Sequence, residues 1–244
     1  RDRCITRRGG KPVFVDIDED TFNIDVNKIE EKVTKNTVGI VPIHLFSQMA
    51  DMDKIMDIAG KHNLRVLEDA AEGFGMRWKG NGSEYKHSGT IGDFGIFSFF
   101  PTKTLGGFGD GGMIVTNNDE LARLARMYRV HGASKKYHYE HIGYNSRLDT
   151  IQAAILQVKM KYIKESIKKR EIVANWYFDR LKDCQELKFA TLKGEQNPVY
   201  YVFNILTEKR DELGEYLKKN QIQFSIYYPI PLHLQRLSLI HISD

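Results

Sequence analysis

Lys103 stands between an apolar segment and a run of glycines, in the stretch FSFFPTKTLGG (residues 97–107). Upstream, a second apolar segment (residues 64–67) ends in the acidic stretch EDAAE (residues 68–72), which contains Asp69. In open α/β sheets ligands bind at the carboxyl ends of strands, so this amine and this carboxylate are expected to meet there. Pyridoxal phosphate requires a lysine that forms a Schiff base and an aspartate that keeps its ring nitrogen protonated. Either residue alone is more often solvated, so only the pair predicts a cofactor site.

Alternating strands and helices are predicted through the first two thirds of the chain. Helices are expected after Asp25 and from Asp51 to His62, because each aspartate can cap a helix that carries an apolar face. Apolar segments at residues 12–15, 37–43, 64–67, 94–99 and 112–116 are predicted strands. Near-continuous apolar strands between amphipathic helices indicate an α/β fold with a mainly parallel sheet covered on both faces.

The pattern becomes mostly helical after residue 118. One helix is expected around residues 121–128, and a longer one over 149–181. The longer helix is predicted to bury one apolar stripe, which consists of Ile151, Ala154, Ile155, Val158 and Tyr162. A strand (200–205), a helix (211–220) and another strand (221–226) follow. We therefore divide the chain into a large domain at 1–160 and a linking helix with part of a small α/β domain at 161–236.

Composition favours an ordinary globular protein. The chain has 244 residues, of which 41% are hydrophobic and 28% charged, and its net charge of +4 does not indicate nucleic-acid binding. Two cysteines without metal-ligand spacing favour a reducing, cytoplasmic setting and no structural metal. No apolar run approaches the roughly 20 residues that a membrane span requires.

Several motifs, in the same order, resemble the DegT/DnrJ/EryC1/StrS family of sugar aminotransferases. Besides the two stretches around Asp69 and Lys103, they are Gly92-Asp93-Phe94-Gly95, Gly109-Asp110-Gly111-Gly112, His131-Gly132, Gly143–Asp149, Ile151–Leu156 and Pro231-Leu232-His233. The resemblance extends from about Gly10 to Gln235. It implies the type I fold of pyridoxal-phosphate-dependent transferases, which has a mainly parallel sheet of seven strands, incomplete here, and a smaller C-terminal α/β domain.

The resemblance also assigns site residues. Lys103 corresponds to the Schiff-base lysine, Asp69 to the partner of the ring nitrogen, and Ser98 to a contact of the cofactor phosphate. Without the resemblance, Ser98 is equally well a small strand residue that faces a helix. Glu72 departs from many relatives, which have Gln or His near the cofactor ring and its phenolic oxygen. A carboxylate there would be repelled unless it were protonated or displaced.

Three further residues are weaker candidates. Asn145 corresponds to a residue that reaches into the neighbouring subunit to contact the phosphate, which implies a homodimer with shared sites. It is equally well an ordinary turn residue after Gly143. Arg147 and His44 correspond to substrate contacts, and His44 is equally well an interior histidine with its hydrogen bonds satisfied.

The implied reaction moves an amino group from an amino acid, usually glutamate, to a nucleotide-linked keto-sugar, for polysaccharide or amino-sugar biosynthesis. Lys103 then serves as the general acid and base. A sugar dehydratase of the same fold is disfavoured, because such relatives carry histidine in place of the lysine. A non-catalytic or regulatory protein that keeps the fold remains an alternative.

Two short motifs resemble ligand sites but lack the context that those sites require. The sequence GFGDGG (residues 107–112) satisfies the dinucleotide fingerprint G-x-G-x-x-G, but it precedes a predicted strand, whereas that fingerprint opens a helix. His138 and His141 lack further ligands at zinc spacing and are predicted to lie in a loop.

Both ends of the chain differ from the family pattern. Relatives carry roughly 80 residues before the first predicted strand, including a phosphate-binding turn, so we expect the 244-residue chain itself to bind the cofactor weakly and to be inactive. Residues 237–244 do not resemble the family, and the segment 237–242 back-translates onto a sequencing adaptor. They are predicted to be a sequencing artefact.

Overall fold

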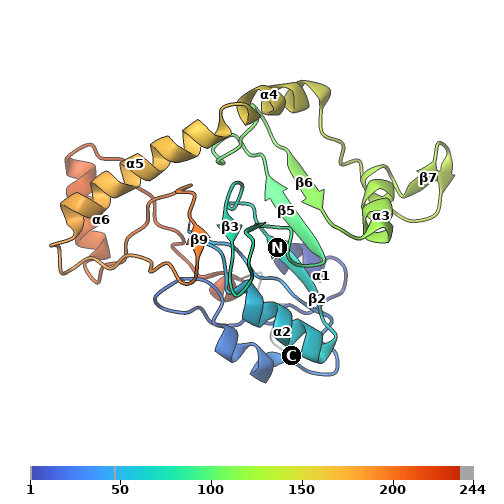
Figure 1. Ribbon diagram of the computed structural model, residues 1–244, viewed down its shortest axis with the longest axis horizontal. Helices are drawn as coiled ribbons and strands as arrows, with labels where there is room; N and C mark the ends of the chain where they lie inside the picture. Colours follow the sequence, from blue (N-terminus) through green and yellow to red (C-terminus); the bar gives the residue numbers. More distant parts are fainter. Residues whose placement is uncertain (1, 47, 237–244) are drawn as a thin grey trace.

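A four-stranded sheet forms the centre of the computed structural model, which describes residues 2–46 and 48–236 (Figure 1). The strands are β1 (Gly39–Ile40), β2 (Arg65–Asp69), β5 (Phe94–Ser98) and β6 (Gly112–Val115), in the spatial order β1-β2-β5-β6. β1, β2 and β5 are parallel, and β6 pairs antiparallel with β5. The mainly parallel sheet and the α/β class are therefore as predicted.

Helix α2 (Met52–His62) packs against the sheet and is defined at both ends by its sequence. At its start the Asp51 carboxylate accepts a hydrogen bond from the Lys54 amide, and at its end Asn63 adopts the left-handed conformation. Its buried face contains Met52, Ile55 and Ala59, at the spacing of helical turns. This face joins a core cluster that includes Val66 of β2.

A second, antiparallel sheet joins distant parts of the sequence. It has the order β4-β3-β9, with β3 (Arg77–Trp78) between β4 (Lys86–His87) and β9 (Gln196–Asn197). Val199, just after β9, is completely buried in the same core cluster as α2. The segment after residue 160 thus contributes to the core of the predicted large domain, and packing continues across the predicted boundary.

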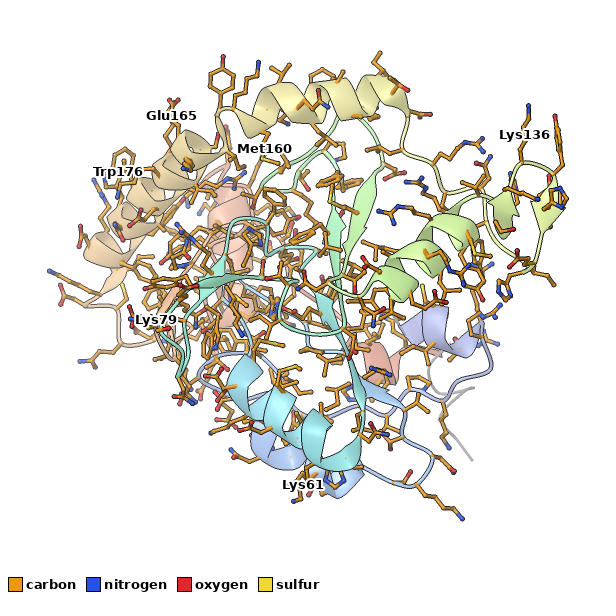
Figure 2. The ribbon with its side chains drawn as sticks, turned by 45° about the vertical axis from the view of Figure 1, so that its right-hand side comes forward. Lys61, Lys79, Lys136, Met160, Glu165 and Trp176 are labelled. Atoms are coloured by element: carbon orange, nitrogen blue, oxygen red, sulfur yellow. The ribbon has the colours of Figure 1, made fainter. Side chains whose placement is uncertain are left out.

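Helix α3 (Asp119–Arg129) and the hairpin of β7 (Ala133–Lys135) and β8 (His138–Tyr139) form an arm at one side of the molecule (Figure 1). The Asn118 side chain caps α3 by accepting a hydrogen bond from the Leu121 amide. Figure 2 places Lys136 at the far tip of this arm.

The predicted helix over residues 149–181 is two helices, α4 (Thr150–Met160) and α5 (Ile163–Leu181). Lys161 and Tyr162 form the break, where amides bond to carbonyls three residues back rather than four. Figure 2 places Met160 at this junction and shows Trp176 projecting outward from α5.

The predicted buried stripe of this region is wrong for α4. Ile151 is 70% exposed and Val158 55%, whereas Leu156 is buried. The physical reason is that α4 turns the face of Gln152, Leu156 and Lys159 toward the rest of the molecule, because two polar groups on it bind the loop after Lys103.

Other predicted elements are shorter or absent among the described residues. Residues 12–15, 200–205 and 221–226 belong to none of the described sheets. After Asp25 the chain makes two 3₁₀ turns, η1 (Val26–Lys28) and η2 (Glu30–Lys32), instead of an α-helix. The β-branched residues there favour longer helices poorly. The remaining elements are α1 (Asp2–Thr6), α6 (Arg210–Lys219) and η3 (Leu232–Leu234).

Two further points concern membrane-spanning helices and the C-terminal segment that was predicted to be a sequencing artefact. No helix within residues 2–46 and 48–236 is both long enough and apolar enough to cross a membrane. The segment 237–244 lies outside the described residues.

Candidate active site

Asp69 ends β2 and Ser98 ends β5, so both lie at the carboxyl edge of neighbouring parallel strands. Asp69 pairs with Ile96 across the ladder, and Ser98 is two residues further along. Because side chains alternate along a strand and paired residues point the same way, Asp69 and Ser98 share one face of the sheet. Asp69 is only 1% exposed, and its Oδ1 accepts a hydrogen bond from the Ala71 amide.

The loop that carries Lys103 leaves β5 and returns through β6. It is closed by hydrogen bonds from the Phe99 amide to the Gly111 carbonyl and from the Gly107 amide to the Phe99 carbonyl. A side chain at Gly106 would lie 2.4 Å from the Pro101 carbonyl oxygen, so this position requires glycine. The loop is thereby fixed on both sides of Lys103.

The amine of Lys103 lies against a carboxylate and an aromatic ring. Its Nζ is 3.4 Å from Oε1 of Glu72 and 4.0 Å from the centroid of the Tyr201 ring. The side chain of Lys103 is 15% exposed and that of Glu72 is 7% exposed. The amide of Phe46 donates to the other Glu72 oxygen, at 3.4 Å. Glu72 therefore faces a cation here, which offsets the charge that makes its position unusual.

A second buried carboxylate, Glu68, stabilises the end of β2 from the other side. Glu68 Oε1 accepts hydrogen bonds from the amides of Ile91 and Gly92, both at 2.6 Å. Its Oε2 accepts one from the Gly89 amide at 2.8 Å and lies 2.9 Å from Nε2 of His44. Although burial raises the pKa of Glu68, these hydrogen bonds and the His44 ring outweigh it and lower the pKa overall.

His44 is completely buried, and both of its ring nitrogens have partners. Nδ1 accepts a hydrogen bond from the Ala50 amide at 3.2 Å, so Nε2 carries the proton that it donates to Glu68. The His44 amide also donates to the Asp69 carbonyl at 3.0 Å. This geometry favours the interior role of His44 over a substrate contact, and it fixes the backbone that carries Asp69.

Replacing Glu68 by glutamine is expected to lower the free energy of unfolding at pH 7 by about 3 kcal/mol, because several buried donors lose a charged acceptor. Since the folded pKa of Glu68 is lowered, its stabilisation is present above the unfolded pKa and is lost as pH falls through the folded pKa. Urea unfolding of both proteins should therefore give converging stabilities in acid. Glu165→Gln, which removes an exposed α5 carboxylate paired with Lys169, should have little effect; a pH-independent Glu68→Gln deficit would contradict this assignment.

Helix α4 holds the loop after Lys103 through two polar side chains. Gln152 Oε1 accepts a hydrogen bond from the Phe108 amide at 2.8 Å, and Lys159 Nζ donates to the Gly106 carbonyl at 2.5 Å. The two side chains are seven residues apart, so they lie on one face of α4. The helix therefore restrains the segment that follows the lysine.

Gln152→Leu is expected to speed hydrogen exchange of the Phe108 amide by about five- to tenfold, because that amide loses its acceptor. Exchange measured by NMR or by mass spectrometry of the loop peptide would test this. Gln157→Leu, on the exposed side of α4, is the matched control. Equal protection in the two variants would show that Gln152 does not restrain the loop.

Asn145 and Arg147 are both exposed and lie between the β7–β8 hairpin and α4. The backbone of Asn145 forms an isolated bridge with Val130. Among the described residues, the amine of Lys103 has its ion pair with Glu72 and none of its hydrogen bonds with Asn145 or Arg147. The structure therefore does not bring these two candidates to the lysine within one chain.

The two short motifs also have defined places. Residues 107–112 lead into strand β6 rather than a helix, so the dinucleotide interpretation lacks its structural context, as predicted. His138 lies in β8 of the hairpin instead of a loop. Among the described residues, no three His, Cys, Asp or Glu side chains are placed to hold a metal ion.

The residues at this edge fit pyridoxal phosphate by their chemistry. A mostly buried amine can bond its aldehyde, a buried carboxylate at a strand end can hold a proton on its ring nitrogen, and a strand-end hydroxyl can contact its phosphate. These groups are Lys103, Asp69 and Ser98. If Lys103 were an ordinary surface lysine and Asp69 only a helix cap, they would not both be this strongly buried at one edge of the sheet.

Sequence reasoning missed four residues around the site. Glu68 belongs to the acidic stretch at residues 68–72, but its role could be seen only once the amides of the loop at residues 89–92 were found to bond its carboxylate. Gln152 and Lys159 were placed on a helix with the wrong face inward. Tyr201 was placed in a predicted strand, and its aromatic ring gave no signal that it covers Lys103.

Comparison with known proteins identifies relatives along nearly the whole chain. The sequence profile of the DegT/DnrJ/EryC1/StrS aminotransferase family matches residues 2–239. The "pleiotropic regulatory protein" of Geobacillus stearothermophilus is 48% identical over 95% of this chain and 61% of that protein. The UDP-N-acetyl-3-dehydro-alpha-D-glucosamine 3-aminotransferase of Acidithiobacillus ferrooxidans is 40% identical over 94% of this chain and 60% of that protein.

Solved structures agree with this assignment. DesV of S. venezuelae, in complex with a ketimine intermediate, matches with a TM-score of 0.91 and 35% identity, over 97% of this chain and 62% of that one. NtdA of Bacillus subtilis, with bound cofactor PMP, matches with a TM-score of 0.84 and 32% identity, over 98% and 55%. The chain spans about three fifths of the length of the curated relatives. It belongs to the DegT/DnrJ/EryC1/StrS aminotransferase family.

Proposed function

We propose that this protein uses pyridoxal phosphate to transfer an amino group from an amino acid to a nucleotide-linked keto-sugar. The observation that carries the proposal is the position of Lys103, whose mostly buried amine lies beside Glu72, three residues after the buried Asp69. A lysine amine and a strand-end carboxylate in this arrangement are what the cofactor requires. Family membership and the relatives' names support the same function.

The cofactor, when bound, supplies a ring that accepts the electron pair left when a proton leaves the substrate carbon. Lys103 would hold the cofactor through Nζ, and its free amine would move that proton as general base and then general acid. Asp69 holds a proton on the ring nitrogen through its buried carboxylate. Ser98 contacts the phosphate, and the loop restrained by Gln152 keeps Lys103 in reach.

The substrate class rests on the relatives. The Acidithiobacillus ferrooxidans protein is named for a UDP-linked keto-sugar, and other relatives for dTDP-linked sugars. We infer a nucleotide-linked keto-sugar as acceptor and glutamate as donor, with the reaction located in the cytoplasm. Both Cys4 and Cys184 are unpaired thiols in the structure, which agrees with a reducing setting.

A homodimer with shared sites completes the proposal, with Asn145 contacting the phosphate in the partner subunit. Its support is the exposed apolar side of α4, which includes Ile151 and Val158, together with the exposed segment between the β7–β8 hairpin and α4 that carries Asn145. Arg147 on the same segment is proposed to contact substrate. Sedimentation of the protein made from its complete open reading frame should show a dimer, and an active monomer would contradict this part.

A regulatory function is the second candidate, because the Geobacillus stearothermophilus relative bears that name. A single experiment separates the two. The protein made from its complete open reading frame, loaded with pyridoxal phosphate, should absorb visible light, and glutamate should shift that absorbance. A nucleotide-linked keto-sugar should then reverse the shift. Cofactor binding without any response to amino donors would favour the regulatory function.

A further inference from the structure

Tyr201 covers the amine of Lys103, although the two residues come from distant parts of the chain. Nζ of Lys103 lies 4.0 Å from the centroid of the Tyr201 ring, within the range of a cation–π contact. Tyr201 follows β9, the strand that returns to pair with β3. The late segment of the chain thus supplies one wall around the reactive nitrogen.

The position of Tyr201 is fixed by contacts that do not involve Lys103. Its hydroxyl lies 3.2 Å from Oγ1 of Thr102, and its amide donates to the carbonyl of the completely buried Val199 at 2.7 Å. Arg170 of α5 donates to the carbonyls of Tyr200 at 3.1 Å and of Tyr201 at 3.3 Å. The ring is therefore held in place before the amine reaches it.

Glu72 provides the second contact of the amine, through Oε1 at 3.4 Å. The Phe46 amide donates to its Oε2, which orients the carboxylate. A carboxylate and an aromatic face both attract an ammonium group, and both are stronger where water is scarce. With the Lys103 side chain only 15% exposed, the two contacts act together on one nitrogen.

We propose that Tyr201 and Glu72 form a rest site for the free amine of Lys103. A lysine that both bonds a cofactor and transfers protons must be unbonded for part of each cycle, and a fixed location then keeps it oriented. In this site the amine is shielded from solvent, because the Lys103 side chain is only 15% exposed. Tyr201 and Glu72 are thus positioning residues. The inference rests on the proposed use of Lys103, but its test does not require activity.

Amine labelling of the 244-residue chain tests the rest site. The protein is dialysed with hydroxylamine to remove bound aldehyde and is briefly methylated with formaldehyde and a borane reductant. Peptide mass spectrometry then gives the labelling rate of Lys103 relative to the exposed Lys164. Tyr201→Leu should raise this ratio about two- to thirtyfold, the range of a lost cation–π contact. Glu72→Gln should raise it in the same direction.

Tyr201→Phe is the matched control, because it keeps the ring face and loses only the hydroxyl. Its ratio should stay close to that of the unchanged protein; a ratio like that of Tyr201→Leu would overturn the role of the ring. Lys159 reports on loosening of the loop, since it donates to the Gly106 carbonyl. If its rate also rises in Tyr201→Leu, Glu72→Gln decides the question alone.

Unchanged Lys103 labelling in Glu72→Gln and in a folded Tyr201→Leu would refute the rest site. That result is distinct from failure of the proposed function. If the protein made from its complete open reading frame never bonds pyridoxal phosphate, the aminotransferase proposal fails. The labelling ratios would still show whether Tyr201 and Glu72 shield the amine of Lys103.

Discussion

Lys103→Ala is expected to abolish the covalent bond to pyridoxal phosphate and to lower turnover by about 10²- to 10⁴-fold, the usual contribution of a general acid and base. The test uses the protein made from its complete open reading frame, in which borohydride should fix the cofactor to one lysine. Peptide mapping should place the label on Lys103. The physical reason is that, within the described residues, no other amine lies next to Glu72.

Lys164→Ala is the control for this experiment, because Lys164 is an exposed residue of α5. It should keep both the label and the activity. Methylamine added to Lys103→Ala should restore a small part of the turnover by supplying a free base. A label on a different lysine would refute the assignment of Lys103.

The second large effect is expected for Asp69→Asn, which should still bind the cofactor but turn over about 10²- to 10³-fold more slowly. The amide keeps the size of the side chain but cannot hold a proton on the ring nitrogen by charge. A loss of about 3–4 kcal/mol, at the lower end of the cost of losing one member of a buried charge pair, corresponds to that range. Cofactor affinity and turnover should be measured separately, because only turnover is expected to change strongly.

Asp93→Asn is a matched control at the opposite end of the same two strands. Asp93 precedes β5, and its carboxylate accepts hydrogen bonds from the Val66 amide and from Arg65, both at 2.8 Å. It should reduce stability modestly and leave turnover per folded molecule nearly unchanged. Similar losses of turnover in both variants would indicate that Asp69 acts through the sheet rather than at the site.

The central sheet could be predicted because its strands are apolar, and helix α2 could be predicted because its cap depends on residues close in sequence. Asp51 begins its helix as expected, since a cap depends on a few neighbouring residues. The predicted strand at 200–205 failed for the opposite reason. A strand exists only where another backbone pairs with it, and sequence periodicity does not reveal that partner.

The same distinction applies to the site. Lys103 and Asp69 are recognisable because the motif and the strand end are both local in sequence. Tyr201 was wrongly placed in a strand, and His44 was left with two interpretations. The roles of both residues depend on contacts across the fold. For Glu68, the deciding contacts are amides of the loop at residues 89–92, which no pattern in the strand itself indicates.

The contact between Thr102 and Tyr201 spans 99 positions of the chain. During synthesis, the sheet that carries Asp69 and Lys103 therefore leaves the ribosome well before the ring that covers the lysine. A nascent chain would have its reactive amine exposed to metabolites that contain aldehydes until residues beyond 201 emerge. The amine of Lys103 is thus protected from such metabolites only once the segment that carries Tyr201 has been made and has packed onto the sheet.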